Sequence, residues 1–206
     1  MRERIVNAAL QTLISTGYSN ASVRAIATTG GFSPGLVFYH FGSVDALLLA
    51  VLDRVSGERL ARYKNRLADV TNFRSLTTAM DELYAEDVQL GQLTAVQEIV
   101  GAMAFDPVLG VEIVERMQAW MTFAEQLAVR ILAGSPLAGL VDPSVIGPAV
   151  IALYLGLEIV ARMRAGDSSG STALMTTLTE AAPLIDQLLG KATSGRRRPA
   201  TKVAIE

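Results

Sequence analysis

Side chains that perform covalent or acid–base chemistry are few in this chain and do not form a group. It has one histidine, His40, and no cysteine, so neither a histidine-based nucleophile nor a cysteine-histidine metal site is expected. Glu112, Glu115 and Glu125 fall on one predicted helix, but nothing pairs them as acid and base, and a solvated face is the expected reason for them. We therefore expect no enzyme, no cofactor and no metal.

The remaining chemistry is recognition, and it gathers between residues 22 and 47. Ser22 and Ser33 stand where helix N-caps are expected, and Pro34 follows at a first helical position. Gly30 and Gly31 lie between the two caps, where the chain must turn sharply. They lack the flanking strand of a phosphate-binding loop. This spacing predicts a helix-turn-helix.

The elements that position this stretch are predicted to be helices, because no run of strict alternation argues for a strand. A first helix over residues 3–16 ends at Gly17, and a long helix begins at Ser43 and ends near residues 69–72. We predict an all-α fold whose later helices lie near 73–88, 93–104, 107–133, 143–165 and 171–190. Asp106 and Asp142 each precede a proline as N-caps, and Pro183 is expected to kink or divide the last helix.

Charge divides the 206 residues into three parts. Residues 1–67 carry eight basic and four acidic side chains, residues 68–190 carry five and fifteen, and residues 191–206 carry five and one. Such an asymmetry fits a head that meets an anionic polymer. We expect a DNA-binding head over 1–45, a ligand-binding and dimerisation body over 46–190, and a basic, disordered tail over 191–206 that includes Arg196 to Arg198.

Nothing in the sequence suggests a membrane protein. Charged residues open the chain without a secretory leader. The longest apolar run, residues 143–157, is interrupted by Gly147 and Pro148 and falls short of the roughly 20 residues that a span needs. We expect a buried helix there, and a cytoplasmic protein.

The head resembles the DNA-binding head of the TetR (tetracycline-repressor) family of bacterial transcriptional regulators. That family's pattern is met at fixed spacing by Ala27, Gly31, Ser33, Gly35, Phe38, Tyr39, His40, Phe41, Gly42 and Ser43. The resemblance covers about a quarter of the chain; beyond it, only the number and length of the helices are similar.

The resemblance implies a homodimer that places its third helix in successive major grooves of a near-palindromic DNA operator. Residue by residue, the resemblance implies that Arg24 reaches a base edge. It also implies that Pro34, Gly35 and Leu36 face bases, and that Ser22, Tyr39 and His40 contact phosphates. The DNA-binding set is Ser22, Arg24, Ser33, Pro34, Gly35, Leu36, Tyr39 and His40. Arginine pairs with guanine and apolar side chains contact the thymine methyl, so we expect a half-site with one guanine read by Arg24 and thymine read by Leu36 or Pro34.

Two departures from the family pattern weaken this footprint. Phe38 stands where the family usually has a tyrosine, and Val44 replaces a lysine that commonly opens the fourth helix. Phe38 lacks a hydroxyl that would bind a DNA phosphate, and Val44 lacks a positive charge beside the DNA backbone. They keep open a second interpretation, a helical small-molecule-binding or scaffold protein whose head has weak or lost DNA affinity.

The family resemblance also implies a pocket for a small-molecule effector within the helical body. Met117, Trp120 and Met121 share one helical face, which is more often plain core but also suits an adaptable apolar site. The full set of candidate ligand-binding residues is Tyr84, Met103, Phe105, Met117, Trp120, Met121, Tyr154 and Glu158. We expect a small apolar or amphipathic effector that releases the DNA. Two roles stay open for Glu158: an anchor for a polar or cationic group of the effector, or an ion pair between subunits with Arg162 or Arg164.

The two last helices carry more apolar residues than one face can hold. This pattern, over 143–165 and 171–190, predicts burial on two sides. A homodimer interface explains it, and a monomer that buries both helices in its own core is the alternative.

Overall fold

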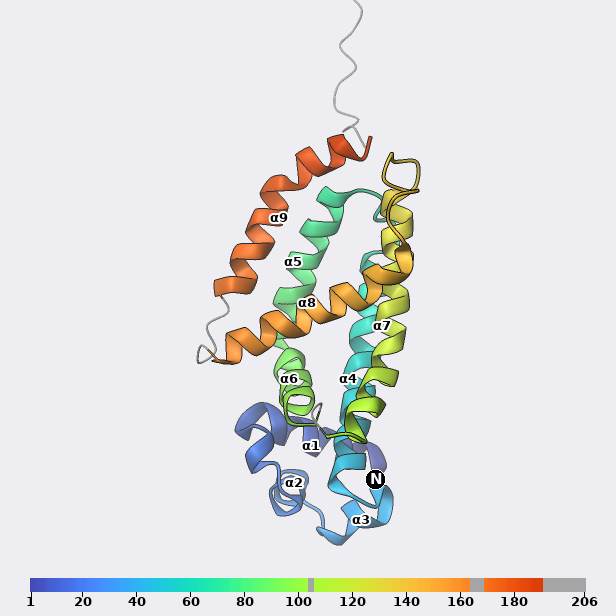
Figure 1. Ribbon diagram of the computed structural model, residues 1–206. Helices are drawn as coiled ribbons and strands as arrows, with labels where there is room; N and C mark the ends of the chain where they lie inside the picture. The colour runs from blue at the N-terminus through green and yellow to red at the C-terminus, as the bar shows by residue number, and fades with distance from the viewer. Residues whose placement is uncertain (104–105, 164–168, 191–206) are drawn as a thin grey trace, which may run out of the picture.

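The computed structural model describes residues 1–103, 106–163 and 169–190, and these ranges are helical without any strand (Figure 1). The helices have the following bounds: α1 Arg2–Thr16, α2 Val23–Gly30, α3 Gly35–Phe41, α4 Val44–Arg66, α5 Phe73–Gln89, α6 Gln92–Met103, α7 Leu109–Leu132, α8 Pro143–Met163 and α9 Ser169–Leu188. The predicted all-α fold is confirmed, and most predicted ends agree within two residues.

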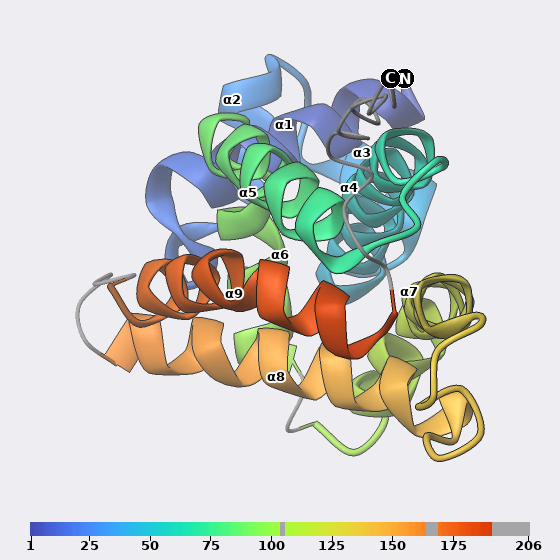
Figure 2. The same ribbon diagram turned by 90° about the horizontal axis from the view of Figure 1, so that it is seen from above.

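An elongated arrangement separates a head from a body. Figure 1 shows α1, α2 and α3 at one end, with α4 running from them into the body beside α5, α6 and α7. We call α1 to α3 with the first turns of α4 the head. In the body α8 crosses α7, and α8 and α9 lie side by side as an outer layer (Figure 2).

The turn of the helix-turn-helix depends on its two glycines. Ser22 caps α2 by accepting a hydrogen bond from the Ala25 N–H at 3.2 Å. Gly31 then ends the helix in the left-handed region, with φ of 63°. At Gly30, an added Cβ would lie 2.8 Å from the Cβ of Ala8. Only glycine therefore lets α2 pack this closely against α1.

One hydrophobic core joins the head to the body. Its fully buried side chains include Ile5, Leu13, Ile26, Val37, Leu47 and Val51 from the head, and Ile99 from α6. A second cluster, with Tyr63, Leu67, Leu83 and Ile131 among its buried members, lies farther along α4. Because α4 contributes to both clusters, it connects the head rigidly to the body.

Two predicted helix starts are shifted. No side chain caps α3, which begins at Gly35 after Pro34 rather than at a Ser33 cap; the Leu36 N–H bonds instead to the backbone oxygen of Ser33 at 3.0 Å. The helix expected from residue 107 begins at Leu109. Asp106 still accepts hydrogen bonds from the two N–H groups of residues 108 and 109, and these bonds lower the pKa of its carboxyl.

Two predicted helix ends or breaks also differ. The fourth helix ends at Arg66, earlier than expected, because the chain must become extended before Asn72 can cap α5. Pro183 does not divide the last helix, since α9 continues through it to Leu188. The start of α8 is as predicted: the Asp142 carboxylate accepts a hydrogen bond from the Ser144 N–H at 3.0 Å.

The predicted burial of α8 is only half met within one chain. Gly147 is buried against α7, where an added Cβ would lie 2.4 Å from the backbone oxygen of Met121. The opposite face is open, and its exposed apolar side chains include Val145, Leu153, Val160 and Met163, together with Leu184 and Leu188 of α9. The expectation of a helix buried in its own chain is therefore wrong for this face.

No single described helix is long and apolar enough to cross a membrane; α3 and α4 reach that length and hydropathy only when taken together across a 67° bend.

Candidate functional site

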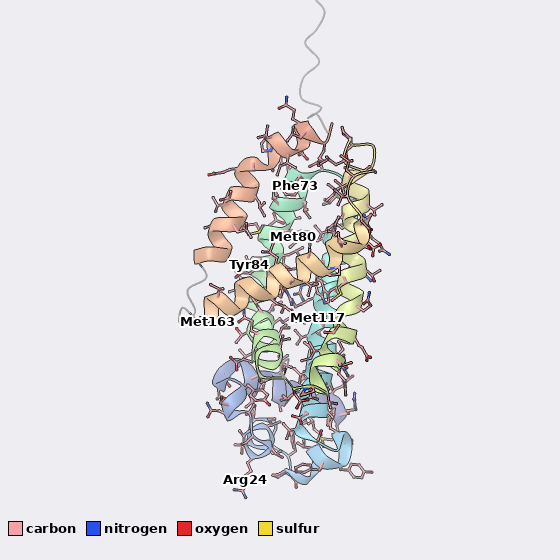
Figure 3. The ribbon with its side chains drawn as sticks, in the orientation of Figure 1. Arg24, Phe73, Met80, Tyr84, Met117 and Met163 are labelled. Atoms are coloured by element: carbon pink, nitrogen blue, oxygen red, sulfur yellow. The ribbon has the colours of Figure 1, made fainter. Side chains whose placement is uncertain are left out.

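The first candidate site is the outer surface of the head. Arg24 is exposed on α2 and projects from the end of the molecule opposite the body (Figure 3). A shallow groove between α2 and α3 brings Arg24 together with Ser33 and Pro34. Three candidate DNA-binding residues, from two helices, thus share one open surface.

The third helix presents a mixture of exposed and packed side chains. Tyr39 is 81% exposed, and its ring meets the half-buried His40 ring edge to face, with centroids 5.0 Å apart. Gly35 is exposed beside it, whereas Leu36 is half-buried against the head core. Pro34 is therefore the more accessible of the two apolar residues expected to contact thymine.

The two departures from the family pattern have different structural settings. Phe38 is 54% exposed on the same helix as Tyr39, so the surface has an apolar ring where a hydroxyl was expected. Val44 packs against the head core. Ser22, although exposed, uses its hydroxyl oxygen to cap α2.

The second candidate site is a cavity of about 140 Å³ inside the body. Three helices, α4, α7 and α8, supply most of its wall, and α5 and α6 add one residue each. The lining residues are Leu52, Ser56, Arg59, Tyr63, Met80, Val96, Arg116, Met117, Trp120, Val150, Ile151 and Tyr154. The wall is therefore apolar and aromatic apart from two arginines and a few hydroxyls.

Three of the predicted ligand residues line this cavity: Met117, Trp120 and Tyr154. Met121 and Tyr84 do not, although they lie on α7 and α5, two helices that contribute to the wall. The remaining predicted residues are outside what the structure describes: Phe105 entirely, and Met103 and Glu158 in their side chains.

Trp120 is fixed in the wall by hydrogen bonding and ring packing. Its indole N–H donates to the hydroxyl oxygen of Ser56 at 2.6 Å, which ties α7 to α4. The rings of Tyr63 and Phe123 meet it edge to face, with centroids 5.0 Å and 6.5 Å away. Such contacts hold the indole in one orientation toward the cavity.

Arg59 on α4 is buried, with 6% of its surface exposed, although arginine side chains are usually exposed. Its Nε donates to the Asp87 carboxylate at 2.7 Å. Its guanidinium carbon lies 5.4 Å from the Trp120 ring centre and 5.7 Å from that of Tyr154. Arg59 is thus a charged group in an aromatic enclosure.

The Asp87 carboxylate is fully buried and is shared by three donors. Besides Arg59, it accepts hydrogen bonds from the Tyr63 hydroxyl at 3.0 Å and from Arg62. Burial by itself would lower the pKa of Arg59, but Tyr154 and Asp87 beside it outweigh that effect and hold the pKa above its ordinary value. Arg59 is therefore charged at every physiological pH.

The sequence reasoning missed most of the cavity wall, including Ser56, Arg59, Tyr63 and Arg116. One signal was present: Arg59 follows Val55 by four residues and precedes Tyr63 by four, so it falls on the apolar stripe of the helix.

Comparison with known proteins supports the head first. Residues 5–51 match the family model described as bacterial regulatory proteins, tetR family. The transcriptional regulator UidR of Escherichia coli strain K12 is 33% identical over 69 residues, which are 34% of this chain and 35% of that protein. The transcriptional repressor Rv1474c of Mycobacterium tuberculosis is 33% identical over 81 residues, 39% of this chain and 43% of the repressor. The chain thus matches less than half the length of either relative.

The whole fold has relatives among solved structures. A transcriptional regulator from Saccharomonospora viridis, solved in complex with choline, superposes with a TM-score of 0.66 over 87% of this chain and 94% of its own length. Since only 19% of the residues are identical, this likeness concerns the fold alone.

Proposed function

This chain belongs to the TetR family of bacterial transcriptional regulators, and we propose that it is a homodimeric repressor of a near-palindromic operator, released by a small molecule bound in the body. Its place of action is the cytoplasm, with the chromosome. The relative Rv1474c is named a repressor, and the S. viridis regulator was solved with a bound small molecule; both support the proposal.

A single observation carries this proposal: one helix, α4, is part of both candidate sites. Its first turns place Leu47 and Val51 in the head core. Its later turns place Arg59 and Tyr63 in the cavity wall. A ligand that favours one position of α4 must therefore also favour one position of the head, and such coupling typically changes affinity about 5- to 150-fold.

We assign the DNA contacts to the open surface of the head. In this assignment, Arg24 pairs with guanine, and Pro34 and Leu36 contact thymine. Gly35 faces the bases beside them, Ser22, Tyr39 and His40 contact phosphates, and Ser33 completes the DNA-binding set.

The dimer is assigned to the open apolar face of α8 and α9. Exposed apolar patches of this kind mark protein interfaces, and obligate homodimers bury about 2,000 Å² or more. Sedimentation equilibrium tests this assignment: Leu153→Glu is expected to give monomers and Val114→Glu to leave the dimer intact. The two side chains are 54% and 56% exposed, but Val114 belongs to α7 and to neither of the two helices that form that face. A Leu153→Glu protein that stays dimeric would contradict the interface.

DNA binding is tested with the purified protein and the DNA flanking its gene, at several salt concentrations. A dimer that neutralises roughly 6 to 10 phosphates is expected to give a log–log salt slope of about −5 to −9. The absence of any specific complex at low salt would overturn the proposal. It would favour instead a helical small-molecule-binding protein, for which the exposed Phe38 is the supporting observation.

A further inference from the structure

We propose that the cavity takes a compact anionic ligand, an aromatic carboxylate of about the size of benzoate, whose carboxylate pairs with Arg59. This inference rests on the proposed function in that it assigns the effector class to the same cavity. It replaces the expectation of a ligand held by Glu158.

The charge of the wall favours an anion. Arg59 and Arg116 both line the cavity, and no carboxylate does so among the side chains that the structure describes. The acids that pair with these arginines do not line the cavity: Asp87 pairs with Arg59, and Asp53 and Glu112 pair with Arg116 at 2.9 Å and 3.0 Å. A cationic ligand would therefore meet two arginines and no carboxylate among the lining side chains that the structure describes.

Arg59 has more donors than partners. A guanidinium has five N–H donors. Among the described residues, Arg59 donates to Asp87 at 2.7 Å and to the Tyr154 hydroxyl at a long 3.5 Å, and it also interacts with the Tyr63 hydroxyl, which leaves guanidinium donors over. The donors that remain are close to the aromatic wall, where a carboxylate could accept two of them at once. A neutral ligand without an acceptor oxygen would leave them unpaired, and a neutral carbonyl would accept a weaker hydrogen bond than a carboxylate.

The size and the lining of the cavity limit the rest of the ligand. A dry cavity of about 150 Å³ holds a single benzene ring, and this cavity has about 140 Å³. Leu52, Met80, Met117 and Ile151 supply an apolar surface, and the Trp120 indole can meet an aromatic ring edge to face. One ring with a carboxylate satisfies the volume, the apolar surface and the charge together.

Three probes of nearly the same shape separate these contributions. Benzoate is an anion, benzamide is neutral, and benzamidine is a cation. We measure their binding to the intact protein by calorimetry and by the fluorescence of Trp120, the only tryptophan in the chain. Benzoate is expected to bind and to change the fluorescence, benzamide to bind roughly 10- to 100-fold more weakly, and benzamidine not to bind. Benzamide or benzamidine binding as tightly as benzoate, or no benzoate binding at millimolar concentration, would overturn the assignment.

A cavity-filling variant locates the binding. Because Arg59 also neutralises the buried Asp87, its replacement disturbs the fold and is a poor test. Ile151→Phe fills the cavity from α8, and its matched control Val114→Phe adds the same ring on an exposed site of α7. Ile151→Phe is expected to lose benzoate binding while keeping its thermal transition, and Val114→Phe to bind as the parent does. Equal benzoate binding by both variants would place the ligand elsewhere.

The operator assay keeps this inference separate from the proposed function. Benzoate that binds the cavity without changing operator affinity would support the ligand class and contradict effector control. A protein that binds its operator specifically but does not bind benzoate would support the regulator and contradict the ligand class.

Discussion

The carboxylate of Glu98 on α6 accepts a hydrogen bond from the backbone N–H of Tyr18, at 2.6 Å. Tyr18 begins the short 3-10 turn that follows α1, so this bond ties the body to the head across 80 positions of sequence. A second contact lies at the turn before α6, where an added Cβ on Gly91 would be 3.0 Å from Ile14. Together with α4, these contacts leave the head little freedom to move independently of α6.

The first prediction concerns this tie. Glu98→Ala is expected to raise the hydrogen-exchange rate of the Tyr18 amide about 10- to 100-fold, because hydrogen bonds to charged groups contribute about 1.5 to 3 kcal/mol. Glu98→Gln, which keeps an acceptor oxygen, is expected to have a smaller effect. NMR measurement of hydrogen exchange at the Tyr18 amide tests this prediction. Unchanged protection in the alanine variant would show that other contacts hold this turn.

The fold was largely predictable because helix ends carry local signals. Ser22, Ser43 and Asn72 each accept the capping hydrogen bond that their type favours, and the match of residues 5–51 to the tetR family model confirmed the recognised head. The shifted start of α7 shows the limit of this approach. Asp106 accepts hydrogen bonds from the nearby N–H groups within a turn and does not act as the N-cap of α7. Both geometries suit an aspartate, so the residue type alone does not predict which one forms.

The cavity was much less predictable because its parts come from different helices. The position of Arg59 on an apolar stripe could be read from α4 alone, but its partner Asp87 lies on α5, 28 residues later. Sequence periodicity shows which face of a helix is buried and not which helix packs against it. Trp120 and Met117 could be predicted as pocket residues because large apolar side chains are usually buried. Arg116 and Ser56 could not, because polar side chains are usually exposed.

The second prediction concerns the buried carboxylate. Asp87→Ala leaves Arg59 and Arg62 without their shared partner, and breaking a buried ion pair from one side costs about 3–5 kcal/mol of the free energy of unfolding. Glu82→Ala is the matched control, since Glu82 also lies on α5 and pairs with an α4 arginine, Arg66, but both side chains are half exposed. That pair is expected to contribute about 0–1 kcal/mol. Urea denaturation measures both, and equal losses would show that Asp87 is not the stabilising partner inferred here.

The third prediction concerns the crossing of α7 and α8. An alanine Cβ at Gly147 would lie 2.4 Å from the backbone oxygen of Met121, so Gly147→Ala must push the two helices apart. Overpacking of this kind costs about 1–3 kcal/mol. Gly57→Ala, on an exposed turn of α4 with no described atom within 4 Å, is expected to stabilise by about 0.5–1 kcal/mol. Thermal unfolding of the two variants should therefore shift in opposite directions, and a shift of the same sign in both would argue against a tight crossing.

The fourth prediction concerns base recognition by the head. Arg24 projects from the head into solvent (Figure 3), and if it pairs with a guanine, Arg24→Ala should lose about 1–3 kcal/mol of discrimination at one position of each half-site. Tyr39→Ala should instead weaken binding to all operator variants by a similar factor, because a phosphate contact carries no sequence information. Arg74→Ala, an exposed arginine that begins α5 beside Phe73 at the far end of the body, removes the same charge away from the DNA surface. Binding of the parent and the three variants to single-base operator substitutions separates these effects. An unchanged base preference at every position in Arg24→Ala would show that Arg24 does not read a base.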